Sequence, residues 1–455
     1  MTSRAQRTTR DLRWHNRSDV LTRLYLRECT NRNDLARASG LSAATISNVV
    51  SDLIADGLVG ENGSQSSAGG RPRSLLRVRP DFGHVVGVDI GETEIRVGLF
   101  DWTLQPVADD EVRAVATAQI PPHEVADQIL SEIAAVTARA GITPDGLLGV
   151  GIGVPGAGGS VIHAPTLGWS AVPLAGLLRA GLGFAPDVDN GAMALGQAEN
   201  WRGAARGAER AVTLLLGIGA GGALSMTAGP AGRARSFTME WGHTVVDLDG
   251  PMCRCGARGC LETYIGAEAI LARYAAMPGS APFDGGGGDG AGVGSGGGGG
   301  VGGGGGDGGG GGGAGVGGVG AGGGGGVGGV GAGGGGGGGG VEAHLAELVA
   351  RAVKHQEPAA SAVLDETARY LGVGISNLIN LVAPDRVILS GWAGALLCDA
   401  LLPAVRLVVR QHALPYLQEF TRIEPGELGP SATALGAATL PVARLLADGG
   451  RRGDE

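Results

Sequence analysis

The segment between residues 240 and 262 concentrates side chains that bind metals. Its imidazole and its thiols are, in chain order, His243, Cys253, Cys255 and Cys260. These are ligand types that zinc prefers, and four of them complete its tetrahedral coordination. Gly256 and Gly259 free the backbone to curl so that all four side chains can face one centre. The spacing therefore predicts a structural Zn²⁺ site, because four protein ligands leave no position for a catalytic water.

A disulfide with one spare thiol and a set of unpaired buried thiols are the alternatives for these cysteines. The chain has two other cysteines, Cys29 and Cys398. It shows no signal peptide, and we find no apolar run that approaches the roughly 20 residues of a membrane span. We therefore expect a cytoplasmic protein without a membrane partner, in a reducing environment that disfavours disulfides.

A glycine-rich run interrupts the second half of the chain. Residues 285–340 hold 43 glycines in 56 positions. Such a segment has almost no side chain to bury and the largest backbone entropy to lose, so we expect a disordered insertion in a surface loop. A fibrous role is the alternative, although the run lacks the strict third-residue period of collagen.

Charge is divided unevenly along the 455 residues. Residues 1–80 carry 13 arginines and 7 acidic residues, a formal +6, whereas the whole chain carries −9, so the remainder carries −15. A basic head on an acidic body indicates that the head binds an anion. Nucleic acid is the natural partner.

The first 80 residues have the pattern of a helix-turn-helix. A first amphipathic helix is expected over 17–28, with an apolar stripe formed by Val20, Leu21, Leu24 and Leu26. A second helix is capped by Thr30 or Asn31 and is broken by Gly40, and a third begins after Ser42. This order of helix, tight turn and helix is typical of DNA-binding heads.

Two surfaces of this head can contact DNA. Small side chains that fit a major groove lie near the start of the third helix, at Ala43, Ala44, Thr45, Ser47 and Asn48. The chain then turns at 61–64 and returns along 74–79, which resembles a β-wing. Between these strands, Arg71 and Arg73 lie on a glycine- and proline-shaped loop that suits a narrow minor groove. We therefore predict DNA binding, with a small protein-interaction module as the alternative.

The body changes to β-rich runs that end in glycine turns. The first turn carries Asp89, Gly91 and Thr93, a second glycine-rich turn follows at 217–224, and a third strand over 381–391 ends in glycine. A glycine turn exposes backbone donors that can hold the phosphates of ATP, as the first hairpin does in the actin-like ATPase fold.

Taken together, these features resemble the ROK family of repressors, open reading frames and kinases. The shared motifs are the segment from Gly151 to Gly156, the motif from Glu240 to His243 and the cysteine-rich loop. The resemblance, which runs from Asn16 to about Leu446, implies an α/β fold. A winged helix-turn-helix head precedes a two-lobed actin-like, ribonuclease H-like domain.

The domains implied are the head at 1–80, a first lobe at 83–195 that is completed by 435–447, and a second lobe at 196–434 that contains the zinc loop. The resemblance also implies a sugar pocket between the lobes. The sugar-binding positions carried over from ROK sugar kinases are Gly156, Thr166, Asn190, Glu240, His243 and Glu262. Thr166 replaces the usual Asn, so the sugar specificity does not transfer. An alternative role for Glu240 and Glu262 is to orient the zinc ligands, and both roles can coexist.

Gly191 decides between enzyme and sensor. In ROK kinases this position is the aspartate that takes a proton from the sugar hydroxyl, and glycine has no side chain to act as base. Asp189 is a poor substitute, because a strand residue displaced by one would point to the other face. Glu92 and Glu94 add carboxylates beside the expected phosphate path, where they would repel a polyanion unless they point to solvent. We predict no sugar phosphorylation and weak or absent ATP binding.

The leading interpretation is a sugar-responsive, DNA-binding transcriptional regulator of carbohydrate metabolism genes, in the commoner case a repressor. A small sugar or sugar phosphate would bind the cleft and change how a homodimer, or a dimer of dimers, presents its winged helices to operator DNA. One alternative is a glucokinase-like ROK sugar kinase with an appended head. Another is a zinc-stabilised scaffold that neither binds sugar nor catalyses.

Overall fold

The structure is a computed structural model. It describes residues 9–26, 31–67, 70–108, 111–114, 120–143, 146–156, 161–228, 233–283, 339–429 and 431–451. The chain divides into two units, Met1–Ala281 with Gly337–Glu455, and Pro282–Gly336. Nearly all of the predicted glycine-rich insertion, residues 285–338, lies outside the described residues. The elements below all belong to the first unit.

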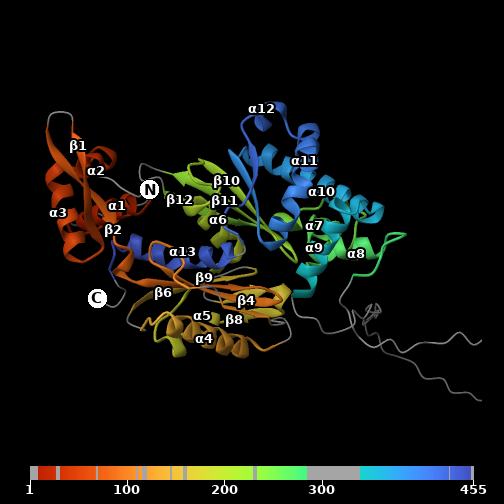
Figure 1. Cartoon of the computed structure of the whole chain (residues 1–455), viewed down its shortest axis with the longest axis horizontal. Coiled ribbons are helices and arrows are strands. Elements are labelled where there is room, and N and C mark those ends of the chain that lie inside the picture. Colours follow the sequence, from red (N-terminus) through yellow and green to blue (C-terminus); the bar gives the residue numbers. More distant parts are fainter. Residues whose placement is uncertain are drawn as a thin grey trace, which may run out of the picture. The chain divides into compact units, whose positions relative to one another are not determined.

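The head consists of three helices and a two-stranded antiparallel sheet (Figure 1). Its elements are α1 (Thr9–Leu26), α2 (Arg32–Ser39), α3 (Ala43–Ala55), β1 (Val59–Ser67) and β2 (Gly70–Val78). The Asn31 side chain caps α2 by accepting hydrogen bonds from two backbone N–H groups, and Gly40 ends the helix in the left-handed conformation. Ser42 caps α3 by accepting a hydrogen bond from the Thr45 backbone N–H. The predicted helix boundaries around this turn are confirmed.

Other boundaries in the head were predicted wrongly. The first helix begins at Thr9 rather than at residue 17, and Leu26 is only partly buried, unlike Val20, Leu21 and Leu24. The polar stretch at 61–64 is not the hairpin turn, because β1 continues to Ser67. The register shifts between Glu61 and Ser64, so these residues form a β-bulge within the strand.

The first lobe is built on a five-stranded sheet in the order β5-β4-β3-β6-β9. Its strands are β3 (His84–Ile90), β4 (Glu94–Asp101), β5 (Glu111–Ala114), β6 (Leu147–Val154) and β9 (Asp187–Asn190). The strands β3, β4 and β5 are antiparallel neighbours, whereas β6 and β9 run parallel to β3. Helices α4 (Pro122–Arg139) and α5 (Leu174–Leu182) lie on one face, and α13 (Ala432–Ala447) covers the other (Figure 1).

The second lobe repeats this plan with the order β12-β11-β10-β13-β14. Its strands are β10 (Arg210–Leu216), β11 (Ala220–Ala228), β12 (Arg233–Met239), β13 (Arg386–Ser390) and β14 (Arg422–Pro425). Again three antiparallel strands adjoin two parallel ones. Helix α6 (Gly191–Arg202) packs on one face of the sheet, and α10 (Pro358–Val382) and α11 (Trp392–His412) pack together beside β13. The predicted two-lobed α/β fold is confirmed.

The remaining helices of this lobe surround its core. They are α7 (Glu262–Ile265), α8 (Ala267–Ala275), α9 (Gly339–Val353) and α12 (Pro415–Gln418). Helix α11 corrects the expectation that no apolar run approaches the length of a membrane span. It has 21 residues, and an 18-residue window of it has a mean hydropathy of 1.7, so it is long and apolar enough to cross a membrane by length and composition. It packs against α10 and β13, and Leu397, Leu401 and Val405 are buried, as in the core helix of a globular domain.

Helix α13 contacts both the first lobe and the head. It lies very close to the sheet at Gly87 and Gly151, where an added Cβ atom would lie 1.9 Å from the backbone oxygen of Ala434 or Ala437. At its other end the Ser18 hydroxyl of α1 donates a hydrogen bond to the Leu446 carbonyl at 2.7 Å. The apolar side chains around this contact form one core that includes residues of α1, β3 and α13.

Candidate functional site

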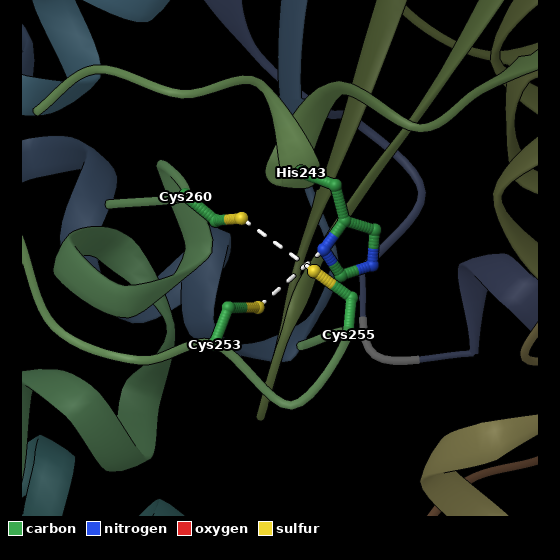
Figure 2. A group of neighbouring side chains, drawn as sticks. All are labelled: His243, Cys253, Cys255 and Cys260. Atoms are coloured by element: carbon green, nitrogen blue, oxygen red, sulfur yellow. Dashed lines mark hydrogen bonds between the residues drawn. The ribbon is translucent and has the colours of Figure 1, made fainter. Parts of the chain in front are cut away.

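Four side chains form a compact group at the zinc loop, which we define as residues 243–260. The ligand atoms of His243, Cys253, Cys255 and Cys260 all lie within 4.8 Å of one another (Figure 2). The Cys253 sulfur is 3.6 Å from His243 Nδ1, and the Cys255 and Cys260 sulfurs are also 3.6 Å apart. A tetrahedral zinc ion with its usual bond lengths separates sulfur ligands by about 3.8 Å. The donor set and its spacing therefore fit Zn²⁺.

The backbone of the loop explains how these side chains converge. Gly256 and Gly259 both have positive φ angles, of 90° and 65°. An added Cβ atom at Gly259 would lie 1.5 Å from the backbone oxygen of Asp247, so the approach of the chain requires glycine. The Cys253 N–H donates to the Ala257 carbonyl at 2.8 Å and closes the turn. The predicted role of both glycines is confirmed.

The thiols differ in how readily they ionise. Burial raises the pKa of Cys260 to about 12 and also raises the pKa of Cys253, whereas a hydrogen bond from the Ala257 backbone lowers the pKa of Cys255. A divalent cation would offset the cost of the buried thiolates. All four described cysteines are free thiols, and Cys29 lies outside the described residues.

A cavity of about 560 Å³ lies beside the zinc loop and is lined by both lobes. The structure brings all six predicted sugar-binding residues to its wall: Gly156, Thr166, Asn190, Glu240, His243 and Glu262. Gly191 and the glycine turn from Gly217 to Gly222 also line it. Residues far apart in the sequence therefore share one cavity.

Asn190 is held mainly by the backbone around it. Its side-chain oxygen accepts hydrogen bonds from the N–H groups of Ala192 and Met193, which caps α6, and its Nδ2 donates to the Gly156 carbonyl at 2.6 Å. One Nδ2 hydrogen remains for a ligand. Thr166 Oγ1, in contrast, is buried and has no hydrogen-bond partner among the described residues.

Gly191 lies at the first position of α6, where it is buried but could accommodate a Cβ atom. An added Cβ atom would meet Thr433 Cγ2 at 3.5 Å, an ordinary van der Waals contact. An added Cβ atom would therefore fit at this position without displacing its neighbours. Asp189 does not line the cavity, and its carboxylate accepts a hydrogen bond from the Asn190 N–H at 2.8 Å, as expected for a residue that cannot take its place.

Arginines neutralise the two glutamates of the first hairpin. Arg254 donates to Glu92 at 2.8 Å, and Arg96 donates to Glu94 at 3.0 Å. The Glu92 side chain is only 19% exposed, so the alternative that it points to solvent is wrong. The repulsion of a polyanion is accordingly weaker than two bare carboxylates would give.

Two residues of the cavity, Arg96 and Arg254, were missed by the sequence-based assignment of the site, and they contribute its positive charge. Asp89, which was predicted on the phosphate-binding turn, lies on β3 beside Thr433. Burial raises the pKa of Asp89 to about 7, and nearby Arg96 opposes part of that rise. Arg254 stands between two predicted zinc ligands, so its position near the site could have been inferred from the sequence. Its partner Glu92 could not be identified, because 162 positions separate the pair.

The predicted DNA-binding face of α3 is largely accessible. Ala43, Ala44, Ser47 and Asn48 are exposed, while Thr45 is partly buried and shares a hydrogen bond of 2.9 Å with Ser42. The opposite face buries Ile46, Val50 and Leu53. Arg71 and Arg73 belong to β2 rather than to a loop, and their side chains lie outside the described residues.

Comparisons with known proteins identify the family. A model of the ROK family matches residues 85–444. The chain is 25% identical to a putative xylose repressor of Caldicellulosiruptor sp. (strain Rt8B.4) over 95% of this chain and 96% of that protein. It is 31% identical to a glucokinase of Streptomyces coelicolor, over 44% of this chain and 61% of that protein.

Solved structures share the fold. A ROK family transcriptional regulator described as a homologue of the Escherichia coli MLC protein superposes with a TM-score of 0.67 at 20% identity, over 96% of this chain and 98% of that one. A ROK glucokinase of Streptomyces griseus gives a TM-score of 0.55 at 21% identity, over 79% of this chain and 99% of that one. The family model covers most of the chain, and its match includes the cavity and the zinc loop; the chain belongs to the ROK family.

Proposed function

We propose that the protein is a sugar-responsive, DNA-binding transcriptional regulator of carbohydrate metabolism genes, acting as a repressor, and that it does not phosphorylate sugars. One observation carries the proposal. The cavity assembles the six predicted sugar-binding residues around Gly191, where a kinase would need a carboxylate. The similarity to a xylose repressor along 95% of the chain, which includes the head, supports the same function.

The roles of the parts follow from their chemistry. Residues 1–80 bind operator DNA, with the exposed face of α3 in the major groove and Arg71 and Arg73 at the minor groove. The lobes at 83–195 with 435–447 and at 196–434 hold the effector between them. Glu240 and Glu262 accept hydrogen bonds from sugar hydroxyls, and Thr166 and Asn190 offer neutral groups.

Zn²⁺ has a structural role in the zinc loop. Four protein ligands complete its coordination, so the ion stabilises the loop that carries His243 and places Glu262 beside the cavity. We expect a homodimer, or a dimer of dimers, in the cytoplasm. Sugar binding would change the relative positions of the lobes and thereby the spacing of two winged helices on paired half-sites.

The regulator function is tested by DNA binding with purified full-length protein. Fluorescence anisotropy with DNA from upstream of its own operon should show specific binding that one sugar of a panel weakens. Asn48→Ala should weaken discrimination among DNA sequences, whereas Arg71→Ala should weaken binding to all sequences and reduce its dependence on salt. Absence of specific DNA binding in every condition would contradict the proposal.

The absence of kinase activity is tested separately. A coupled assay for ADP formation with a panel of hexoses and pentoses should detect no turnover by the wild-type protein. Gly191→Asp restores the carboxylate at a position where an added Cβ atom makes only ordinary contacts, and it shows whether the missing base is the sole obstacle. Turnover of any sugar by the wild type would establish the kinase alternative instead.

A further inference from the structure

The charges that line the cavity discriminate between two kinds of sugar effector. Its described wall carries six acidic side chains: Asp89, Glu92, Glu94, Glu240, Glu262 and Glu342. Two arginines, Arg96 and Arg254, oppose them, and no lysine occurs among the described lining residues. A phosphate ester would bring a further charge of about −1.5 to −2 into this surrounding.

Both guanidinium groups are already engaged by carboxylates of the same wall. Arg96 donates to Glu94 at 3.0 Å. Arg254 donates to Glu92 at 2.8 Å and lies 3.5 Å from Glu262. A phosphate that approached either arginine would share a guanidinium whose charge a carboxylate already offsets, and it would lie beside that carboxylate in a partly buried site.

The backbone of Arg254 is held in a constrained turn. It stands between Cys253 and Cys255, so both neighbours in the chain are members of the metal cluster. The loop around it is closed by the hydrogen bonds from Cys253 N to Ala257 O and from Gly256 N to Cys253 O. The cation is therefore presented from a short, constrained turn, already paired with Glu92.

The groups that remain for a ligand suit hydroxyls. Thr166 Oγ1 is buried without a partner among the described residues, and Asn190 keeps one Nδ2 hydrogen. Glu240 and Glu262 are acceptors for O–H donors, and a neutral polyol can supply several such donors at once. An uncharged sugar can thus form hydrogen bonds with these side chains without breaking an ion pair.

We propose that the effector is an uncharged sugar and that the Glu92–Arg254 pair excludes phosphorylated sugars from the cavity, which rests on the sugar-sensing role proposed above. Glu92 comes from the first lobe and Arg254 from the zinc loop of the second. The pair is thus a specificity determinant that spans the cavity.

Titration calorimetry with the full-length protein tests this. The probes are D-xylose, D-glucose and N-acetyl-D-glucosamine, each beside its terminal phosphate ester. The wild type should bind at least one free sugar and should bind its phosphate ester at least about tenfold more weakly. Glu92→Gln removes the nearer of the two carboxylates beside Arg254 and should strengthen binding of the ester by about tenfold, while the free sugar changes by less than about twofold.

A matched control is Glu366→Gln, which breaks the 2.6 Å ion pair with Arg273 away from the cavity. It should change neither affinity. Equal or tighter binding of the ester by the wild type would overturn the proposal and leave the sugar-sensing role intact. A Glu92→Gln variant that gains no affinity for the ester would overturn the assigned cause. If neither form of any sugar binds, the sugar-sensing role itself is wrong.

Discussion

At the scale of single residues, the metal cluster leads to a direct prediction. Replacing Cys253 by Ser should lower the zinc content from about one ion per chain to near zero and lower the melting temperature by several degrees, because structural zinc sites contribute folding free energy. Elemental analysis and thermal unfolding of reduced protein measure both. Cys398→Ser is the control, since this buried thiol lies outside the cluster. Full zinc occupancy in Cys253→Ser would rule out the site.

Asp89 should make the stability of the folded protein depend on pH. Its pKa rises from 3.8 to about 7, chiefly through burial. The folded protein holds this proton more tightly than the unfolded chain does, so the contribution to stability is complete below about pH 4 and is lost as the pH rises through about 7.

Asp89→Asn cannot ionise and should therefore gain stability over the wild type between pH 5 and pH 8, by at most roughly 3 kcal/mol. Water in the cavity reduces this figure. Urea unfolding at the two pH values measures it, with Asp52→Asn on the exposed side of α3 as the control. If the free energies of unfolding of wild type and variant differed by the same amount at both pH values, the raised pKa of Asp89 would be wrong.

The identities of site residues were predictable where a motif fixes them. Thr166, Asn190, Glu240 and Glu262 all reached the cavity that the family resemblance implied. Their partners were not predictable in the same way. The bond from Asn190 to Gly156 and the pair of Glu92 with Arg254 depend on the fold, and neither leaves a periodic or spaced signal in the chain.

At the scale of elements, the glycine-rich insertion can be tested by removal. Before it, the Ala281 carbonyl accepts hydrogen bonds from Arg351 at 2.7 Å and from Tyr274 at 3.1 Å. These contacts join α8 and α9 without the insertion. Replacing residues 285–338 by about eight Gly and Ser residues should leave the fold intact and raise the free energy of unfolding by up to roughly 1.7 kcal/mol through loop closure.

Thermal unfolding and sugar affinity of this shortened protein provide the measurement. A replacement of equal length with a Gly and Ser sequence separates the effect of length from that of composition. Loss of the cooperative transition in the shortened protein would show that the insertion has a structural role, contrary to the prediction of a tolerated surface loop.

Element boundaries were predictable where side chains cap the backbone. Asn31, Gly40 and Ser42 defined α2 and α3 because each makes a local contact that ends or begins a helix. The stretch at 61–64 was wrongly predicted to be the hairpin turn, since asparagine and glycine fit both a turn and a bulge. Pairing with the partner strand decides between these, and a single strand does not contain that information.

At the scale of the whole molecule, α13 connects the cavity to the head. Thr433 at its start lines the cavity, and the Leu446 carbonyl near its end accepts the hydrogen bond from Ser18. Ser18→Ala should reduce the effect of sugar on DNA affinity by about threefold to tenfold, the equivalent of one hydrogen bond, while the affinity for sugar alone is nearly unchanged.

The measurement is the ratio of DNA dissociation constants with and without the sugar. Ser376→Ala is the matched control, because the Ser376 hydroxyl makes an equally long buried hydrogen bond of 2.7 Å to a carbonyl within α10 alone. An identical ratio in wild type and Ser18→Ala would show that the signal does not pass through this contact.

The glycine at position 191 has an evolutionary consequence. Codons for glycine and aspartate can differ by a single nucleotide, and an added Cβ atom here would meet the Thr433 methyl group at an ordinary contact distance. An enzyme ancestor and a present-day sensor would then differ by one point mutation at the position of the catalytic base. The ion pairs of Glu92 with Arg254 and of Glu94 with Arg96 would require several further mutations. Descendants of such a gene can lose catalysis in one generation and keep an intact binding cavity on which selection for signalling can act.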